Sequence, residues 1–262
     1  MDRIPLQDRR DRLAQLAPRV GPVAFARDRV LPVAPALQPL LPEGGLVRGS
    51  VVGCLGTTAV SVALALVAET SASGSWLAVV GLPTLGLRAA SEVGIALERL
   101  VMIAEPTDPE LKDPDEASWA NLVSALVDGF DLVLLRSSPR LRAGTARRLQ
   151  ARLQARGGVL VVVGDPGQFG CDLTISCPEG MWEGLGAGSG RLVRRRLALT
   201  ARGRRIPRPR QTELWLPGAQ GGIETIHATH HETIHENRRL QHVAAVVAIP
   251  AKADVKTLEK TG

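Results

Sequence analysis

The sequence predicts an α/β fold with a mostly parallel sheet that antiparallel strands extend toward the C-terminus. Between residues 46 and 163, apolar runs of strand length alternate with helical patterns. Parallel neighbours need crossover connections of about a dozen residues or more, so this alternation favours a parallel sheet. After Gly164 the pattern changes to short alternating segments separated by glycine-rich turns, which is typical of antiparallel strands.

The expected elements follow in order. A short amphipathic helix over 8–16 and an extended segment over 20–30 precede the core. The core strands are predicted at 46–55, 76–80, 100–104, 130–135 and 159–163, with helices at 58–69, 87–97, 115–127 and 145–156. The antiparallel strands are expected at 171–177, 191–200 and 212–216.

Three of these segments carry the clearest patterns. Residues 58–69 are apolar nearly all round, as in a helix packed on a sheet face. Residues 159–163 read Val-Leu-Val-Val-Val, which predicts a strand buried on both faces. Residues 106–114 are acidic and interrupted by prolines, so a loop is expected there.

Composition limits the class of protein. The chain has 262 residues, 45% hydrophobic and 22% charged, which suits one sizeable core. Its three cysteines, at irregular spacing, indicate neither a metal site nor a disulfide framework. Met1-Asp2-Arg3 carries an acid where a signal peptide would not, and no apolar run is long enough to span a bilayer. We therefore expect a cytoplasmic protein without metal, cofactor or membrane contact.

The segment 49–69 has the strand, glycine turn and apolar helix of a phosphate-binding loop, without its Gly-Lys pair. Gly53 and Gly56 are separated by two residues, and Thr57 and Thr58 follow directly. A working loop has about four residues between its glycines and a lysine for the γ-phosphate. We interpret these four residues as a degenerate nucleotide loop. The alternatives are a tight turn in which Thr57 or Thr58 caps the helix, or weak anion binding at its N-terminus.

A formal net charge of +6 is compatible with an acidic partner, and arginines gather between residues 191 and 210. Arginine matches phosphate oxygens, so contact with nucleic acid or an acidic partner is one hypothesis. The other is an edge strand guarded against aggregation by its charge. The arginines assigned to this contact are Arg194, Arg195, Arg196, Arg202, Arg204 and Arg205.

Three segments resemble the RecA recombinase core. Residues 41–56 read Leu-Pro-Glu-Gly-Gly-Leu-Val-Arg-Gly-Ser-Val-Val-Gly-Cys-Leu-Gly, similar to the entry into the first strand and phosphate loop. Residues 85–106 resemble the next helix and strand, and residues 130–136 fall at the Walker B strand. The chain to about Pro217, including residues 182–192, resembles the ImuA family and its actinobacterial form, ImuA-prime. The resemblance implies a RecA-like core of the P-loop NTPase type.

The same resemblance shows which catalytic groups are missing. The Walker A lysine has no counterpart, because Gly56 runs directly into Thr57. In the degenerate Walker B segment, which includes Asp131, Arg136 replaces the aspartate that would orient Mg²⁺. The position of the catalytic glutamate falls at Leu82 or Pro83. Electrostatic stabilisation is usually the largest part of such catalysis, so we expect no ATPase activity.

What the resemblance implies is a non-catalytic adaptor of the SOS-induced mutasome. It would bind ImuB, and through it an error-prone DNA polymerase and the sliding clamp, in translesion synthesis after DNA damage. Contacts with RecA-like protomers, with DNA and with the nucleoid after damage belong to the same expectation. The alternatives are a SulA-like cell-division inhibitor and an ATP-dependent, DNA-binding recombinase-like protein.

Three regions are predicted: an N-terminal arm over 1–40, the RecA-like core over 41–217 and an atypical tail over 218–262. The arm either docks on ImuB or a RecA-like neighbour or folds back on its own core; strand addition and pocket filling would suit docking. Its proposed partner-binding residues are Leu13, Leu16, Val20, Val23 and Phe25. The tail holds all five histidines, and residues 231–235 spell a zinc-protease pattern that we interpret as accidental.

Overall fold

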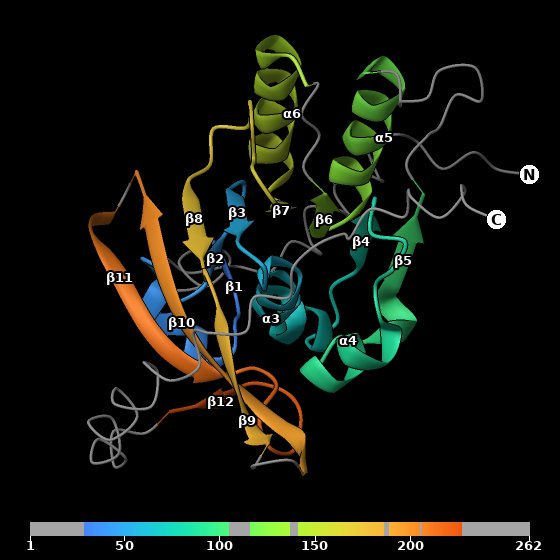
Figure 1. Cartoon of the computed structure of the whole chain (residues 1–262). Coiled ribbons are helices and arrows are strands. Elements are labelled where there is room, and N and C mark those ends of the chain that lie inside the picture. Colours follow the sequence, from blue (N-terminus) through green and yellow to red (C-terminus); the bar gives the residue numbers. More distant parts are fainter. Residues whose placement is uncertain (1–28, 105–115, 137–140, 186–188, 205, 227–262) are drawn as a thin grey trace, which may run out of the picture. The chain divides into compact units, whose positions relative to one another are not determined.

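The computed structural model describes residues 29–104, 116–136, 141–185, 189–204 and 206–226 (Figure 1). Contacts group residues 1–225 into one compact unit and residues 226–262 into a second. The second unit, with the histidine-containing pattern, lies outside the described residues apart from Ile226. Among the described residues, no helix combines the length and apolar character needed to cross a membrane.

The elements have the following bounds. The strands are β1 Val30–Leu31, β2 Leu46–Val47, β3 Val51–Leu55, β4 Leu77–Val80, β5 Leu100–Ile103, β6 Leu132–Arg136, β7 Val159–Val163, β8 Leu173–Ser176, β9 Gly180–Leu185, β10 Gly190–Gly203, β11 Ile206–Trp215 and β12 Glu224–Thr225. The helices are α3 Ala59–Ala72, α4 Leu87–Val93, α5 Glu116–Gly129 and α6 Ala143–Arg156, with short 3-10 helices η1 Pro35–Leu40 and η2 Leu97–Arg99.

A ten-stranded sheet organises the fold, in the order β12-β11-β10-β8-β3-β7-β6-β4-β5, with β9 paired to β10. Strands β3 to β8 pair with one another in parallel, and β9 to β12 form the antiparallel extension. The predicted α/β class, with a parallel core and antiparallel strands at one edge, is confirmed.

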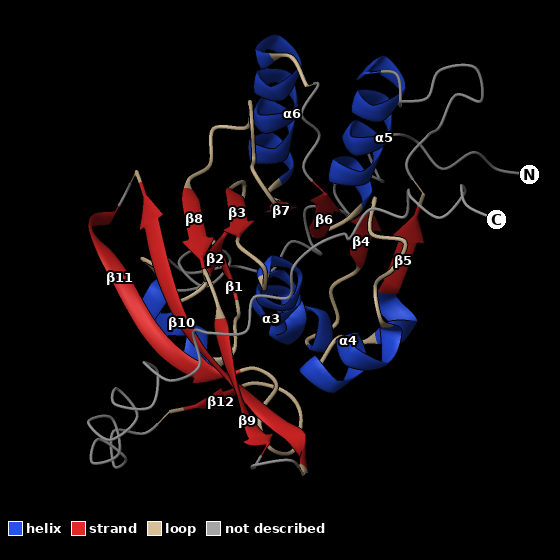
Figure 2. Ribbon diagram, in the orientation of Figure 1, coloured by secondary structure: helices blue, strands red, loops and turns tan. Residues whose placement is uncertain are grey.

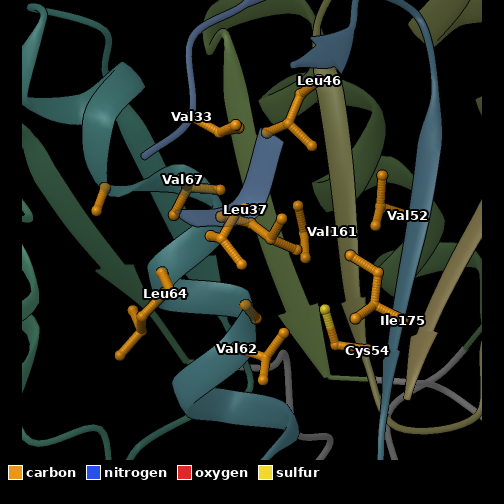
Figure 3. Close-up of a cluster of buried hydrophobic side chains, with 14 of the residues drawn as sticks. Val33, Leu37, Leu46, Val52, Cys54, Val62, Leu64, Val67, Val161 and Ile175 are labelled. Carbon is orange, nitrogen blue, oxygen red and sulfur yellow. The ribbon is translucent and has the colours of Figure 1, made fainter. Parts of the chain in front are cut away.

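Helices cover both faces of the parallel strands (Figure 2). Helix α3 packs on one face, and ten of its fourteen residues are buried, as its apolar pattern predicts. Its Val62 and Val67 lie in one cluster with Leu37, Cys54 and Val161 (Figure 3). Helices α5 and α6 cover the opposite face through a second cluster that contains Trp119 and Phe169.

Part of the predicted arm belongs to this core. Strand β1 pairs with β2, and Leu37 and Leu40 of η1 are fully buried. The Thr70 hydroxyl of α3 donates a hydrogen bond to the carbonyl oxygen of Pro32 (2.7 Å). The described part of the segment 1–40 therefore folds against the chain's own core, whereas the five residues proposed to bind a partner lie outside the described residues.

Two features of the C-terminal strands differ from the prediction. Strand β8 is antiparallel to β10 but parallel to β3, since residues 164–172 carry the chain across the sheet without a helix. Asp172 fixes this crossover, because its carboxylate accepts a hydrogen bond from the Val51 amide (3.0 Å) while its own amide donates to the Val51 carbonyl (2.9 Å). Strand β9 was not predicted at all, since its glycines conceal its strand character.

Candidate functional site

The turn between β3 and α3 consists of Gly56, Thr57 and Thr58. Gly56 has φ +100°, and a Cβ atom there would lie 2.1 Å from the carbonyl oxygen of Cys177. The Thr57 hydroxyl donates a hydrogen bond to the carbonyl oxygen of Pro178 (3.1 Å). The turn is therefore packed against the backbone that follows β8, and it is too short to curl around a phosphate.

The two threonines do not cap the helix through their hydroxyls, so that expectation is wrong. Thr58 occupies the N-cap position with φ −101° and ψ 10°, and its side chain makes no capping hydrogen bond. An N-cap normally has extended backbone angles that aim its oxygen at the helix amides. The buried Thr58 hydroxyl has no hydrogen-bond partner among the described residues.

The Walker B positions lie at opposite ends of β6. Arg136 is paired in register with Val163 of β7, which is itself in register with Cys54 of β3. The exposed Arg136 side chain therefore stands at the same carboxyl edge of the sheet as Gly56. Asp131 precedes the strand at the other edge, where it forms a salt bridge with Arg48 (3.1 Å). The structure thus does not bring Asp131 to the turn.

Ligands of open α/β sheets bind at the carboxyl edge of the strands, so an acidic residue there could take part in catalysis. Of the two residues at the expected position of the catalytic glutamate, Leu82 is buried in the cluster that contains α3, and Pro83 is exposed. Asp165 follows β7, and its carboxylate accepts a hydrogen bond from the Gly167 amide (2.9 Å), as a turn residue does.

Cys54, two residues before the turn, is not available as a nucleophile. Cys54 is fully buried on β3, and burial raises the pKa of its thiol far above the ordinary value. Cys171 is half-buried, and burial raises the pKa of its thiol to about 11. Both thiols are therefore protonated at neutral pH, where the reactive thiolate is absent.

The arginine cluster is split between the two faces of β10, because side chains alternate along a strand. Arg194 forms a salt bridge with Glu183 (2.8 Å) and stacks over Trp215. Arg196, on the same face, forms a salt bridge with Glu213.

Arg195 points to the core side of β10. It donates hydrogen bonds to the Leu216 carbonyl (2.9 Å) and the Ser61 hydroxyl (3.0 Å), and it lies over the Trp182 ring. Burial lowers the pKa of its guanidinium below the ordinary value. This arginine ties α3 to the antiparallel extension.

The remaining arginines lie toward the other end of β10. Arg204 donates to the Gly170 carbonyl (2.9 Å). Arg202 is exposed and has no partner among the described residues, and Arg205 lies outside them. Contact with nucleic acid through this cluster stays a prediction, and the intramolecular bonds of Arg194, Arg195, Arg196 and Arg204 would compete with it.

Exposed apolar side chains mark a surface to which the sequence analysis gave no function. Nine large hydrophobic residues are exposed among the described ones, and five of these belong to β9 and β10. They are Met181, Trp182, Leu185, Leu192 and Val193. The sequence does contain a pattern that indicates this hairpin, because apolar residues lie on both sides of a glycine-rich turn.

Comparisons with known proteins found a family model, a solved structure and a curated relative that are similar to this chain. Residues 39–168 match the family model of the MT3502 N-terminal domain. The KaiC-like protein PH0186 from Pyrococcus horikoshii has a similar structure, with a TM-score of 0.52 and 16% identity. That match covers 76% of this chain and 99% of the archaeal one.

The fold is RecA-like.

One curated relative was also found, the uncharacterized protein Rv3395c of Mycobacterium tuberculosis. It is 36% identical over 126 residues, which are 48% of this chain and 50% of the relative. The chain therefore spans about half the length of that relative. The match and the RecA-like fold are compatible with the family resemblance in the sequence.

Proposed function

We propose that this chain is a non-catalytic RecA-like adaptor in the SOS response to DNA damage. Its resemblance to ImuA assigns it to the mutasome, where it binds ImuB and supports error-prone translesion synthesis. The observation that carries the proposal is the tight β3–α3 turn, whose Gly56 packs on the Cys177 carbonyl.

The surroundings of the turn support the absence of catalysis. The exposed Arg136 puts a positive charge at the edge where Mg²⁺ would be held. The position of the family's catalytic glutamate falls at the buried Leu82 or at Pro83, and neither side chain can act as a general base. A RecA-like scaffold without these groups acts through its surfaces.

Nucleotide titration tests the catalytic half of the proposal. We expect isothermal titration calorimetry to detect no Mg-ATP binding with a Kd below about 1 mM, because the turn lacks both the lysine and the loop length. Magnesium-dependent turnover that the Thr57→Ala variant abolishes would contradict the proposal and favour a recombinase-like enzyme.

Capture of purified ImuB tests the adaptor half. We expect the full chain to retain ImuB, and Leu13→Asp combined with Leu16→Asp to reduce the retained amount. Unchanged capture by this double variant would remove the arm from the interface. Co-purification with the tubulin-like division protein instead of ImuB would favour the SulA-like alternative.

A further inference from the structure

The β9–β10 hairpin lies far from α5 and α6 (Figure 1), and several of its apolar side chains are exposed. Leu185 is 65% exposed, Met181 56% and Leu192 49%. Clusters of exposed apolar residues on a soluble domain mark interaction sites more often than scattered ones do.

One edge of this hairpin is open. Strand β9 pairs with β10 alone among the described strands. Gly180 and Gly184 bring it close to β10, because a Cβ at either position would lie 2.5 Å or less from an atom of β10. The other edge of β9 presents backbone amide and carbonyl groups that an added strand would pair.

The charges beside the apolar surface favour an acidic partner. Residues 180–196 contain four arginines and one glutamate. Arg194 and Arg196 are already in salt bridges, whereas Arg191 and Arg195 have no acidic partner among the described residues. Two such hairpins would repel each other, so a second copy of this chain is a poorer occupant.

We infer that the β9–β10 hairpin docks an extended segment of a protein partner, which adds as a strand to the open edge of β9. The segment has apolar side chains opposite Met181 and Leu185, and an acidic residue within reach of Arg191. This inference rests on the proposed adaptor function and names the surface that the adaptor uses.

Other occupants fit the surface less well. A lipid bilayer would leave the open edge of β9 without hydrogen-bond partners, which is costly in hydrocarbon. A nucleic acid strand would need free arginines and stacking rings, but Trp182 lies beneath Arg195 and Trp215 beneath Arg194.

The test measures the affinity of the full chain for purified ImuB by biolayer interferometry. Leu185→Glu combined with Leu192→Glu adds two charges to exposed positions. We expect the Kd of this variant to rise at least about tenfold, since apolar contacts at an interface centre dominate affinity. Leu87→Glu combined with Leu97→Glu is the matched control, because both leucines are also exposed but lie on α4 and η2. The control should change the Kd by less than about twofold.

Amide hydrogen exchange on the complex tests the mode of docking. Strand addition should slow the exchange of the β9 amides and leave those of β5 unchanged. Unchanged exchange in β9 overturns the inference. Equal affinity of the wild type and the hairpin variant for ImuB also overturns the inference, but it leaves the proposed adaptor function intact. Failure of the wild type to bind ImuB overturns both.

Two further binding measurements distinguish the other occupants. They measure the affinity of the chain for fluorescein-labelled oligodeoxythymidine and for vesicles of phosphatidylglycerol. If the hairpin variant loses binding to either probe and retains ImuB, the surface serves nucleic acid or lipid and the inference is wrong. If it loses ImuB alone, and its melting temperature matches that of the wild type, the inference is supported.

Discussion

Glycines allow a close approach of the backbone in both the β3–α3 turn and the β9–β10 hairpin, but the two regions differ in what remains exposed. In the turn, Gly56 lets the backbone after β3 pack against the carbonyl oxygen of Cys177. In the hairpin, Gly180 and Gly184 let two strands approach while their apolar side chains remain exposed. Glycine thus permits a close approach in both regions, and the hairpin differs in the large apolar side chains that it leaves exposed.

The largest expected effect is a loss of unfolding free energy that tests how tightly the turn packs against Cys177. Gly56 and Gly74 both have positive φ, +100° and +107°, but only Gly56 would place a Cβ against a neighbouring atom. We expect Gly74→Ala to lower the free energy of unfolding by about 1 kcal/mol through backbone strain alone. Gly56→Ala should lower it by about 1–3 kcal/mol more, because the Cys177 carbonyl must move.

Urea denaturation followed by circular dichroism measures both variants. Equal losses of unfolding free energy would mean that the Cys177 carbonyl moves aside at no cost, and the description of a tightly packed turn would be wrong.

A smaller effect separates the two threonines of the turn. Thr57→Val removes the hydrogen bond to the Pro178 carbonyl and should cost about 1 kcal/mol of unfolding free energy. Thr58→Val keeps the shape of the side chain and removes a buried hydroxyl without a partner, so it should be neutral or stabilising. Urea denaturation of the two variants side by side checks the difference, and a greater loss in Thr58→Val would contradict it.

The smallest effect lies outside both regions, in the ion pairs between α5 and α6. Hydrogen bonding from Arg152, with a further contribution from Arg156, lowers the pKa of Asp128 to about 2 from the ordinary 3.8. A lowered carboxyl pKa stabilises the fold above the ordinary pKa, and this stabilisation is lost as the pH falls through the folded value.

The Asp128→Asn variant lacks this titration. Its melting temperature should lie slightly below that of the wild type at neutral pH, and the gap should close as the pH falls from about 4 to about 2. A gap that does not depend on pH would show that Asp128 contributes through packing alone.

The sequence predicted most of the parallel core. Strands β4, β6 and β7 lie within a residue or two of their expected positions, because continuous apolar runs such as residues 159–163 have one reading in an α/β pattern. The antiparallel region was predicted less well. Strands β10 and β11 are longer than expected, and Pro207 and Pro209 of β11 conceal a strand because proline cannot donate to the ladder.

The candidate site was also predicted only in part from the sequence. The missing lysine and the arginine at the end of β6 can be read from the sequence alone. The hydroxyl of Thr57 was misjudged because its partner, Pro178, is 121 residues away. The arginine cluster looked like one charged surface because the bonds of Arg195 to Ser61 and Leu216 depend on how β10 meets α3.

By itself, the sequence determined the α/β class, the parallel core and the absence of a Gly-Lys pair between β3 and α3, because these depend on local patterns and on residue identity. The tertiary structure alone decided that Gly56 packs against the Cys177 carbonyl, that residues 30–40 belong to the core and that the hairpin keeps an apolar surface with an open edge. Each of those depends on contacts between segments distant in the chain, and local propensity carries no information about such contacts.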